Sequence, residues 1–165
     1  MHGTIVAVCT SPQGGIPKYP HTRAVIGRWG FVGDFHNREM RRSFSKPGTM
    51  KPNTDRHLTL VAAEVLEELG RECLGNPLGP GMLAENITVR GLGDLSDVPD
   101  GAEVLIGSAV ELRVVEQNSP CGNVRRAYGL EFYERVQGRR GLLCAIERGA
   151  GTIIRPGDLM KVSGP

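Results

Sequence analysis

Several short segments of the chain alternate apolar and polar residues with a period of two. The clearest is 110–116, where Val110 and Leu112 are separated by Glu111 and followed by Arg113. This alternation is typical of a strand with one buried face. Seven further segments bounded by turn formers are also predicted to be strands: 4–9, which is rich in β-branched residues, and 24–26, 86–90, 103–106, 142–147, 152–154 and 158–162.

Two other segments are predicted to be helices. In 58–69 the apolar positions fall three or four residues apart, so they line one face of a helix. Thr59 is placed to cap the start of this helix, and Gly70 is placed to end it. A second helix is predicted over 124–137, with Asn123 as its capping residue.

Turn-forming residues are abundant, and they shape the expected fold class. The chain of 165 residues contains 23 Gly and 11 Pro, which interrupt helices and supply tight turns. Strands do not alternate regularly with helices, which argues against a doubly wound parallel sheet. We therefore expect a mainly β fold, a closed or nearly closed β-barrel of short strands with two or more peripheral helices, because closure removes exposed strand edges. With roughly 150 residues per domain as a prior, 1–165 is expected to form a single domain.

The overall charge and hydropathy argue against several classes of function. The net charge of +2 is too small for a surface that binds nucleic acid or an anionic membrane. No apolar run is long enough to span a bilayer, and the start lacks the pattern of a secretory leader, so a cytoplasmic protein is expected. Residues 37–52 show little periodicity and are expected to form a long, mobile and functional loop. Its basic residues are Arg38, Arg41, Arg42, Lys46 and Lys51.

The four cysteines are too far apart for paired-cysteine chemistry. Cys9, Cys73, Cys121 and Cys144 are separated by 64, 48 and 23 positions, so no Cys-x-x-Cys metal or redox motif is present. Cys9 and Cys144 lie inside apolar strand segments, and Cys73 lies just past a predicted helix. Packing roles are therefore expected for these three residues.

Cys121 stands between a predicted strand and a predicted helix. The unpaired N–H groups and the dipole at a helix start favour a thiolate, and Arg125 and Arg126 would act in the same direction. A soft thiolate can bind a soft transition metal, carry a persulfide sulfur or attack an electrophile. The alternative is that Cys121 is an apolar filler of the core.

Other polar motifs carry weaker signals. Asp34 and His36 lie in a glycine-rich turn that could point both to one side, although a capping Asp beside an exposed His would have the same sequence. Arg139 and Arg140 lie between glycines and suit a bidentate grip on phosphate or carboxylate, or else belong to a solvated loop. His57 has no partner at metal-ligand spacing. The chain has no P-loop, dinucleotide fingerprint or nucleophile elbow, and no lysine in a Schiff-base context that would suggest pyridoxal phosphate.

Seven short motifs follow one another along nearly the whole chain. They are Gly33-Asp34-Phe35-His36, Arg56 with the 58–69 segment, 85–89, 100–107, Pro120-Cys121, 138–141 and 154–158. Taken in order, they resemble the MOSC family, the domain named after the C-terminal part of molybdenum cofactor sulfurases. The family usually has Gly before its Glu-Asn pair, where this chain has Ala84.

This resemblance implies a β-barrel and a functional Cys121. In family members with known chemistry, the matching cysteine ligates the molybdenum of the pterin cofactor or is proposed to carry sulfur. By the same motifs Asn86 would help to line the site. The resemblance also implies candidates for the rim of a cofactor site, namely His36, Arg56, Arg139 and Arg140.

Three functions follow as hypotheses. The first is a protein that binds molybdenum cofactor (molybdopterin) or carries sulfur, using a thiolate or persulfide at Cys121, with a cysteine desulfurase as sulfur donor. The second is the molybdenum-dependent component of a reductase of N-hydroxylated compounds, served by separate electron-transfer proteins because the chain has no flavin, haem or iron–sulfur signature. The third is a non-catalytic sulfur-carrier or binding module. As an enzyme the protein would be a sulfur transferase or an oxidoreductase component.

Overall fold

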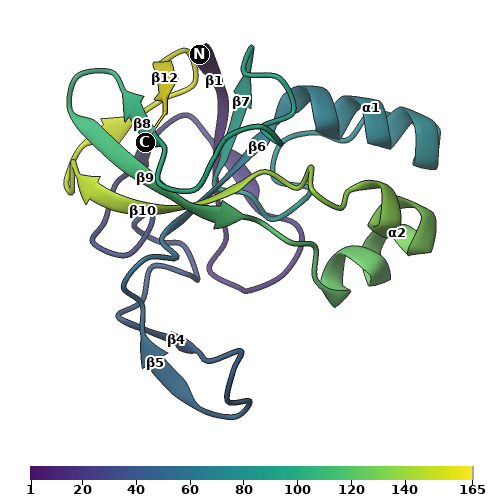
Figure 1. The fold of residues 1–165 in the computed structure, drawn as a ribbon, viewed down its shortest axis with the longest axis horizontal. Helices are drawn as coiled ribbons and strands as arrows, with labels where there is room; N and C mark the ends of the chain where they lie inside the picture. The colour runs from purple at the N-terminus through teal and green to yellow at the C-terminus, as the bar shows by residue number, and fades with distance from the viewer. Residues whose placement is uncertain (165) are drawn as a thin grey trace.

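The computed structural model describes residues 1–164 and contains a closed β-barrel (Figure 1). Its strands are β1 (His2–Thr10), β6 (Leu58–Ala62), β7 (Ile87–Arg90), β8 (Glu103–Ile106), β9 (Val110–Gln117), β10 (Leu142–Arg148) and β12 (Leu159–Ser163). Neighbours follow the order β12-β8-β9-β10-β6-β7-β1, and β1 pairs back with β12 through Gly3 and Met160. The prediction of a mainly β, closed barrel with peripheral helices is confirmed.

Alternation along the strands places one face of each strand in the barrel core. In β9, Val110, Leu112 and Val114 are at most 1% exposed, whereas Arg113 on the opposite face is exposed to solvent. The period of two that predicted this strand is thus the period of its burial. β8 continues the same core, because it pairs with β9 on one side and with β12 on the other.

The 58–69 segment is not one helix, and this prediction was wrong. Its first five residues form β6, which is hydrogen-bonded to β10 on one side and runs parallel to β7 on the other. Helix α1 (Ala63–Leu74) then begins after Ala62, with no side-chain cap from Thr59. A strand buried on both faces is apolar throughout, and such a run cannot be told from a buried helix turn by periodicity alone.

The end of α1 also differs from the prediction. Gly70 lies inside the helix, where a Cβ atom would come within 2.4 Å of the backbone nitrogen of Leu78. The glycine is therefore needed for the close packing of α1 against the following segment, and it does not end the helix. The helix ends four residues later, at Leu74, and its C-cap Gly75 takes the left-handed conformation with φ 80°. Cys73 is therefore in the last turn of α1 and not beyond it.

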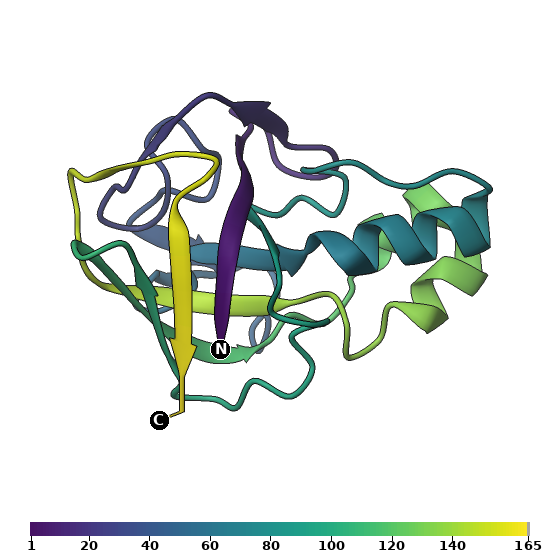
Figure 2. The same ribbon diagram turned by 90° about the horizontal axis from the view of Figure 1, so that it is seen from above.

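The second predicted helix is present as α2 (Gly122–Arg135). Gly129 breaks it with φ 87°, so two short helical pieces meet at a kink. The capping position is Cys121, not the predicted Asn123. Both helices lie beside the barrel on the same side, as Figure 2 shows from above. Among residues 1–164, no helix combines the length and apolar character that crossing a bilayer requires.

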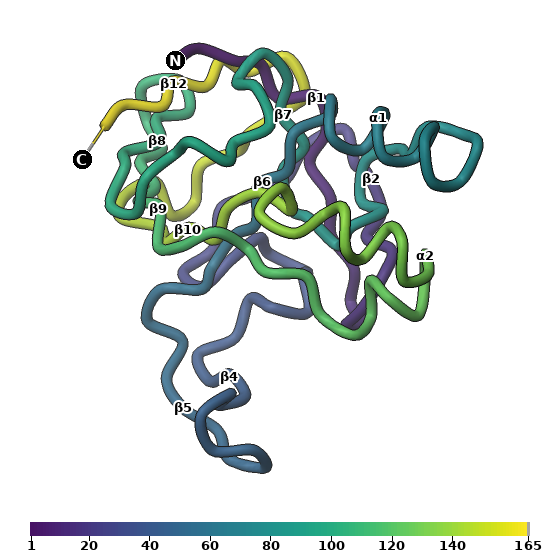
Figure 3. Tube along the Cα trace, turned by 45° about the vertical axis from the view of Figure 1, so that its right-hand side comes forward, coloured from purple at the N-terminus to yellow at the C-terminus, as the bar shows by residue number. Residues whose placement is uncertain are grey.

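Five short strands lie outside the closed barrel. They are β2 (Tyr19–His21), which extends from β1, then β3 (Ala24–Val25) paired with β11 (Ile153–Ile154), and β4 (Met40–Arg42) paired with β5 (Met50–Pro52). The β4–β5 hairpin projects from the barrel (Figures 1 and 3). The expectation of an irregular loop over 37–52 was therefore wrong, because cross-strand pairing gives this segment a regular shape that its weak periodicity did not reveal.

Candidate functional site

Cys121 is delivered to the surface by the turn between β9 and α2. It has an extended backbone with φ −105° and ψ 175°, and its carbonyl accepts the N–H of Val124 at 3.0 Å. The residue is exposed, whereas Pro120 before it is buried. The strand thus fixes the position of the backbone, and the helix start leaves its first N–H groups beside the thiol.

The surroundings of the thiol favour its ionised form. Partial burial alone would raise the pKa of Cys121, but the backbone N–H groups of Asn123 and Val124 and the charge of Arg140 outweigh it and hold the pKa below its ordinary value. The cation that acts on the sulfur is Arg140, whereas Arg125 and Arg126 were expected. Arg126 instead donates to the side-chain oxygen of Asn123. The thiolate is the form of a cysteine that acts as a nucleophile or as a soft metal ligand.

Arg140 is a buried residue that holds the segment before Cys121 in place through hydrogen bonds. Its guanidinium donates from Nη1 to the carbonyl of Ser119 at 2.8 Å and from Nη2 to the carbonyl of Leu83 at 3.2 Å. Only 8% of the residue is exposed, and its Nε is buried without a hydrogen-bond partner among the described residues. Arg140 thus joins the segment before Cys121 to the loop before Asn86.

Glu85 and Asn86 organise that loop from within. The buried carboxylate of Glu85 accepts the N–H of Gly81 at 2.6 Å and the N–H of Leu83 at 3.0 Å, so it fixes the turn that offers Leu83 to Arg140. Asn86 is 2% exposed, and its side chain donates to the carbonyl of Cys9 and accepts from the N–H of Thr59. Asn86 therefore ties β1 to β6. A direct approach of Asn86 to Cys121 remains a prediction.

The remaining expected rim residues are engaged elsewhere. Arg56 pairs with Glu116 of β9. Arg139 binds Glu68 of α1 at 2.9 Å and Asp94 at 3.2 Å. His36 is exposed and meets the Phe35 ring edge-on. Among the expected anchors, the structure brings only Arg140 to the cysteine.

A buried ion pair was missed by the sequence analysis. Lys18 Nζ lies 2.7 Å from Asp34, and both side chains are 1% exposed. Burial would raise the pKa of Asp34, but Lys18 and the N–H groups of Ser11 and His36 hold it below its usual range. The Gly-Asp motif had marked Asp34, but paired it with His36. Nothing in the short polar segment around Lys18 signals that its ammonium group is buried.

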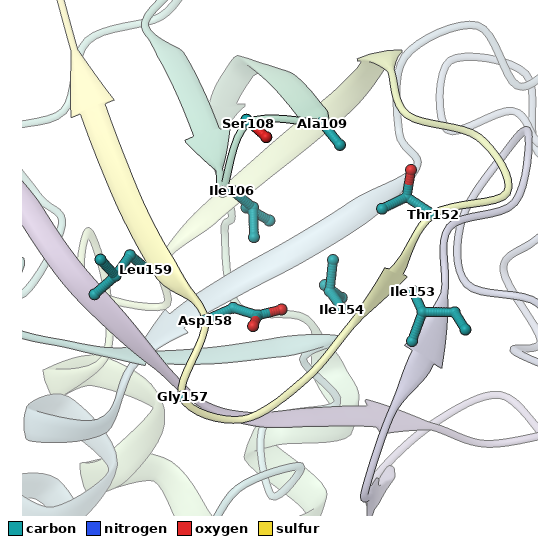
Figure 4. Close-up of a pocket in the computed structure, with 10 residues that line it drawn as sticks. Ile106, Ser108, Ala109, Thr152, Ile153, Ile154, Gly157, Asp158 and Leu159 are labelled. Carbon is teal, nitrogen blue, oxygen red and sulfur yellow. The ribbon is translucent and has the colours of Figure 1, made fainter.

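Metal-ligand clusters offer no competing site within residues 1–164. No three His, Cys, Asp or Glu side chains in this range gather as metal ligands. His57 is buried, and its Nδ1 accepts the N–H of Ile146 at 2.9 Å. A groove of about 400 Å³ lies between the β8–β9 turn and the β11–β12 segment, on the side of the barrel away from α2 (Figures 1 and 4). Its one carboxylate, Asp158, accepts the N–H of Arg155, and no thiol lines it.

Comparison with known proteins agrees with this architecture. The chain belongs to the MOSC domain family, whose sequence profile matches residues 34–161. It is 25% identical over 134 residues to a Bacillus subtilis protein described as "Putative metal-sulfur cluster biosynthesis proteins YuaD". The match covers 72% of this chain and 69% of that protein.

Solved structures share the fold. The crystal structure of the YUAD protein from Bacillus subtilis matches 100% of this chain and 97% of its own with a TM-score of 0.86 at 20% identity. YiiM from Geobacillus stearothermophilus matches 98% of this chain and 75% of its own with a TM-score of 0.71 at 20% identity. YiiM from Escherichia coli covers 100% of this chain and 71% of its own with a TM-score of 0.70 at 18% identity.

Proposed function

We propose that this MOSC protein carries sulfane sulfur on Cys121 for metal–sulfur or molybdenum cofactor chemistry. The observation that carries the proposal is the exposed Cys121 thiol at the start of α2, with a lowered pKa and with Arg140 fixed beneath it. A thiolate is the form that attacks a sulfur atom, and a surface position lets a donor reach it. The description of the related YuaD as a metal–sulfur cluster biosynthesis protein points to the same chemistry.

The proposed step is a thiol–persulfide exchange. The Cys121 thiolate attacks the terminal sulfur of a donor persulfide, of the kind that a cysteine desulfurase forms. A new S–S bond forms on Cys121, the S–S bond of the donor breaks, and the donor departs as a thiolate. The proton stays on the transferred sulfur, and no external oxidant or reductant is consumed. Because Arg140 and the helix N–H groups favour an anion, they stabilise the attacking thiolate. They also stabilise the persulfide anion that forms when the terminal S–H of the product then releases its proton to water.

Molybdenum cofactor binding is the second candidate, and the residues present fit it in part. Cys121 offers the soft sulfur ligand that molybdenum takes, and the cofactor would supply redox chemistry there. The expected anchors for its phosphate form no shared cationic pocket, because Arg56 and Arg139 bind carboxylates and Arg140 binds two carbonyls. Sulfur carriage needs only the thiolate, so the geometry supports it best.

A reductase role would require further partners. A molybdenum-dependent component acting on N-hydroxylated compounds needs electrons from separate proteins, since the sequence carries no motif for a redox cofactor of its own. A module that only binds sulfur for another protein would use the same Cys121. All three functions would use the same thiolate, so what the purified protein holds distinguishes them experimentally.

Composition of the purified protein tests these functions together. The protein is purified from a host that makes molybdenum cofactor, and molybdenum, pterin and cyanide-labile sulfur are measured per chain. We expect sulfane sulfur on the parent and its loss in Cys121→Ala, with Cys73→Ala as the matched control that keeps it. Stoichiometric molybdenum and pterin that disappear in Cys121→Ala would support the second candidate. Sulfur that persists in Cys121→Ala would overturn the role of this residue.

A further inference from the structure

The positive charge of the protein is concentrated in one projecting segment. Residues 37–52 contain five basic residues and one acidic residue, a net charge of +4, whereas the whole chain has +2. The remainder of the chain therefore has a net charge of −2. Arg42, Lys46 and Lys51 are exposed and have no ion-pair partner among the described residues. This segment forms the β4–β5 hairpin, which stands clear of the barrel in Figures 1 and 3.

The same hairpin exposes large apolar side chains. Phe44, Met50 and Met40 are 76%, 54% and 41% exposed, three of the ten large hydrophobic residues with this degree of exposure. The strand register pairs Met40 with Pro52 and Arg42 with Met50, so these four residues share one face of the hairpin, because side chains alternate between faces. Phenylalanine, methionine and arginine are enriched in protein interfaces.

The hairpin is held in shape before any partner arrives. Ser43 donates its N–H to the carbonyl of Thr49 at 2.9 Å, and Asn53 donates its N–H to the carbonyl of Glu39 at 2.7 Å. Phe44 lies in the turn between β4 and β5, and the guanidinium of Arg56 lies 5.4 Å from the centre of its ring. A preformed surface loses less conformational entropy on binding than a disordered one.

We infer that the β4–β5 hairpin is the docking arm for an acidic protein that exchanges sulfur with Cys121. The occupant follows from charge complementarity, because a net charge of +4 beside exposed apolar residues suits a negative surface with an apolar patch. Met40 and Met50 lie on one face of the hairpin. A strand or helix of another protein can cover that face, whereas a bilayer would take up only the tip of the hairpin. This inference rests on the proposed function.

Contacts connect the hairpin to the site. Arg56, which lies over Phe44, pairs with Glu116 near the end of β9, five residues before Cys121. Figures 1 and 3 show the hairpin and the start of α2 on the same side of the barrel. A protein seated on the hairpin can therefore present its persulfide to Cys121.

Charge reversal tests the arm in the full-length protein. The triple variant Arg42→Glu, Lys46→Glu, Lys51→Glu is compared with Arg23→Glu, Arg155→Glu, Lys161→Glu, which makes the same charge change at exposed positions outside the hairpin. Cyanide-labile sulfur on Cys121 is measured after expression in cells and, separately, after treatment of the purified protein with inorganic polysulfide. We expect at least about a tenfold loss of cellular loading in the hairpin variant only, because steering by charge acts on the encounter. Polysulfide loading should stay equal in all three proteins.

A photocrosslinking residue at position 44 identifies what touches the arm. In Phe44→p-benzoylphenylalanine, we expect crosslinks to a peptide rich in Asp and Glu of another protein, and their loss when the hairpin charges are reversed. Crosslinks confined to lipid, to nucleic acid or to a second copy of the chain would overturn the inference. So would equal cellular loading of the hairpin variant and the parent.

The outcomes separate this inference from the proposed function. If the parent accepts no sulfur from polysulfide on Cys121, the proposed function fails. If polysulfide loads Cys121 but reversal of the hairpin charges leaves cellular loading unchanged, only the docking arm fails. Binding of the parent to vesicles with about 30% phosphatidylglycerol at about 0.15 M salt, lost in the hairpin variant, would assign the arm to a membrane surface and count against a protein partner.

Discussion

Cys9 and Cys121 both lie near charged groups, yet the protein shifts their pKa values in opposite directions. Cys9 is fully buried in β1, where burial first, and then the negative charges of Glu85 and Asp34, raise its pKa to about 12. Cys121 is exposed at the start of α2, where N–H groups and Arg140 overcome partial burial and lower its pKa.

The difference shows that the reactivity of a thiol depends on its place in the hydrogen-bonding pattern. In β1 the N–H of Cys9 is already bonded to the carbonyl of Asn86 at 2.7 Å, and sheet pairing leaves no free donors for a thiolate. The first turn of α2 has donors without helical partners. A helix start placed at the barrel surface can therefore supply what a barrel strand cannot.

The largest expected effect is the contrast in alkylation itself. Burial raises the pKa of Cys9 to about 12, whereas the pKa of Cys121 is held below its ordinary value, so the thiolate fraction at neutral pH is larger at Cys121 by orders of magnitude. Burial of Cys9 and Cys144 further slows their alkylation, because the reagent cannot reach them. Iodoacetamide labelling followed by mass spectrometry for each site should find Cys121 modified first, ahead of the half-buried Cys73. Labelling of Cys73 at the same rate would contradict the thiolate at Cys121.

The next effect concerns the ion pair beside Cys9. Lys18→Met leaves the carboxylate of Asp34 buried without its partner and should lower the free energy of unfolding by about 3–5 kcal/mol. The double variant Lys18→Met, Asp34→Asn should recover part of this loss, because the uncompensated charge is removed. Urea unfolding of the parent, both single variants and the double variant measures the coupling. Equal losses in Lys18→Met and in the double variant would refute the electrostatic explanation.

Acid should weaken the same pair. The folded-state pKa of Asp34 lies below its unfolded value, so its contribution to stability is fully present above about pH 4 and is lost as the pH falls through the folded-state pKa. The free energy of unfolding of the parent should therefore fall in acid more steeply than that of Asp34→Asn. Parallel curves for the two proteins below about pH 4 would show that other carboxylates dominate.

A smaller effect sharpens the assignment of Arg140 to the Cys121 thiol. Removal of its charge in Arg140→Met should raise the pKa of Cys121 and slow alkylation at neutral pH severalfold. Arg139→Met is the control, since Arg139 is held by Glu68 and Asp94, and its pH profile should match the parent. Arg140→Lys keeps the charge and should retain a profile close to that of the parent. Arg140→Gln removes the charge but keeps a hydrogen-bond donor, and it provides the measurement if Arg140→Met does not fold. An unshifted profile in the variants without the charge would leave the helix start as the sole cause.

The smallest effect concerns the turn that positions Leu83 for Arg140. Ala84 has φ 63°, a left-handed conformation that strains a residue with a Cβ atom, and related MOSC sequences usually have glycine there. Ala84→Gly should raise the free energy of unfolding by up to about 1 kcal/mol, offset in part by the greater entropy of the unfolded chain. Alkylation of Cys121 should not change. A destabilised Ala84→Gly would show that the alanine methyl packs favourably enough to outweigh the strain.

Much of the barrel was predictable because its information is local. The period of two in β9, the β-branched run of β1 and the apolar run of β10 predicted strands close to those observed. The β6–α1 boundary was not predictable in the same way. Leu58–Ala62 is apolar on both faces because β10 and β7 flank it, and these partners are 25 or more residues away in the chain.

The sequence by itself determined that the chain forms a barrel of short strands and that Cys121 lies between a strand and a helix. Both follow from burial patterns and turn residues within a few positions of each other. Only the tertiary structure decided which charges reach each thiol. Arg140 lies 19 residues after Cys121, and Lys18 lies 16 residues before Asp34. Such pairs are set by barrel closure, which brings distant loops together and removes them from water, and no local pattern encodes that distance.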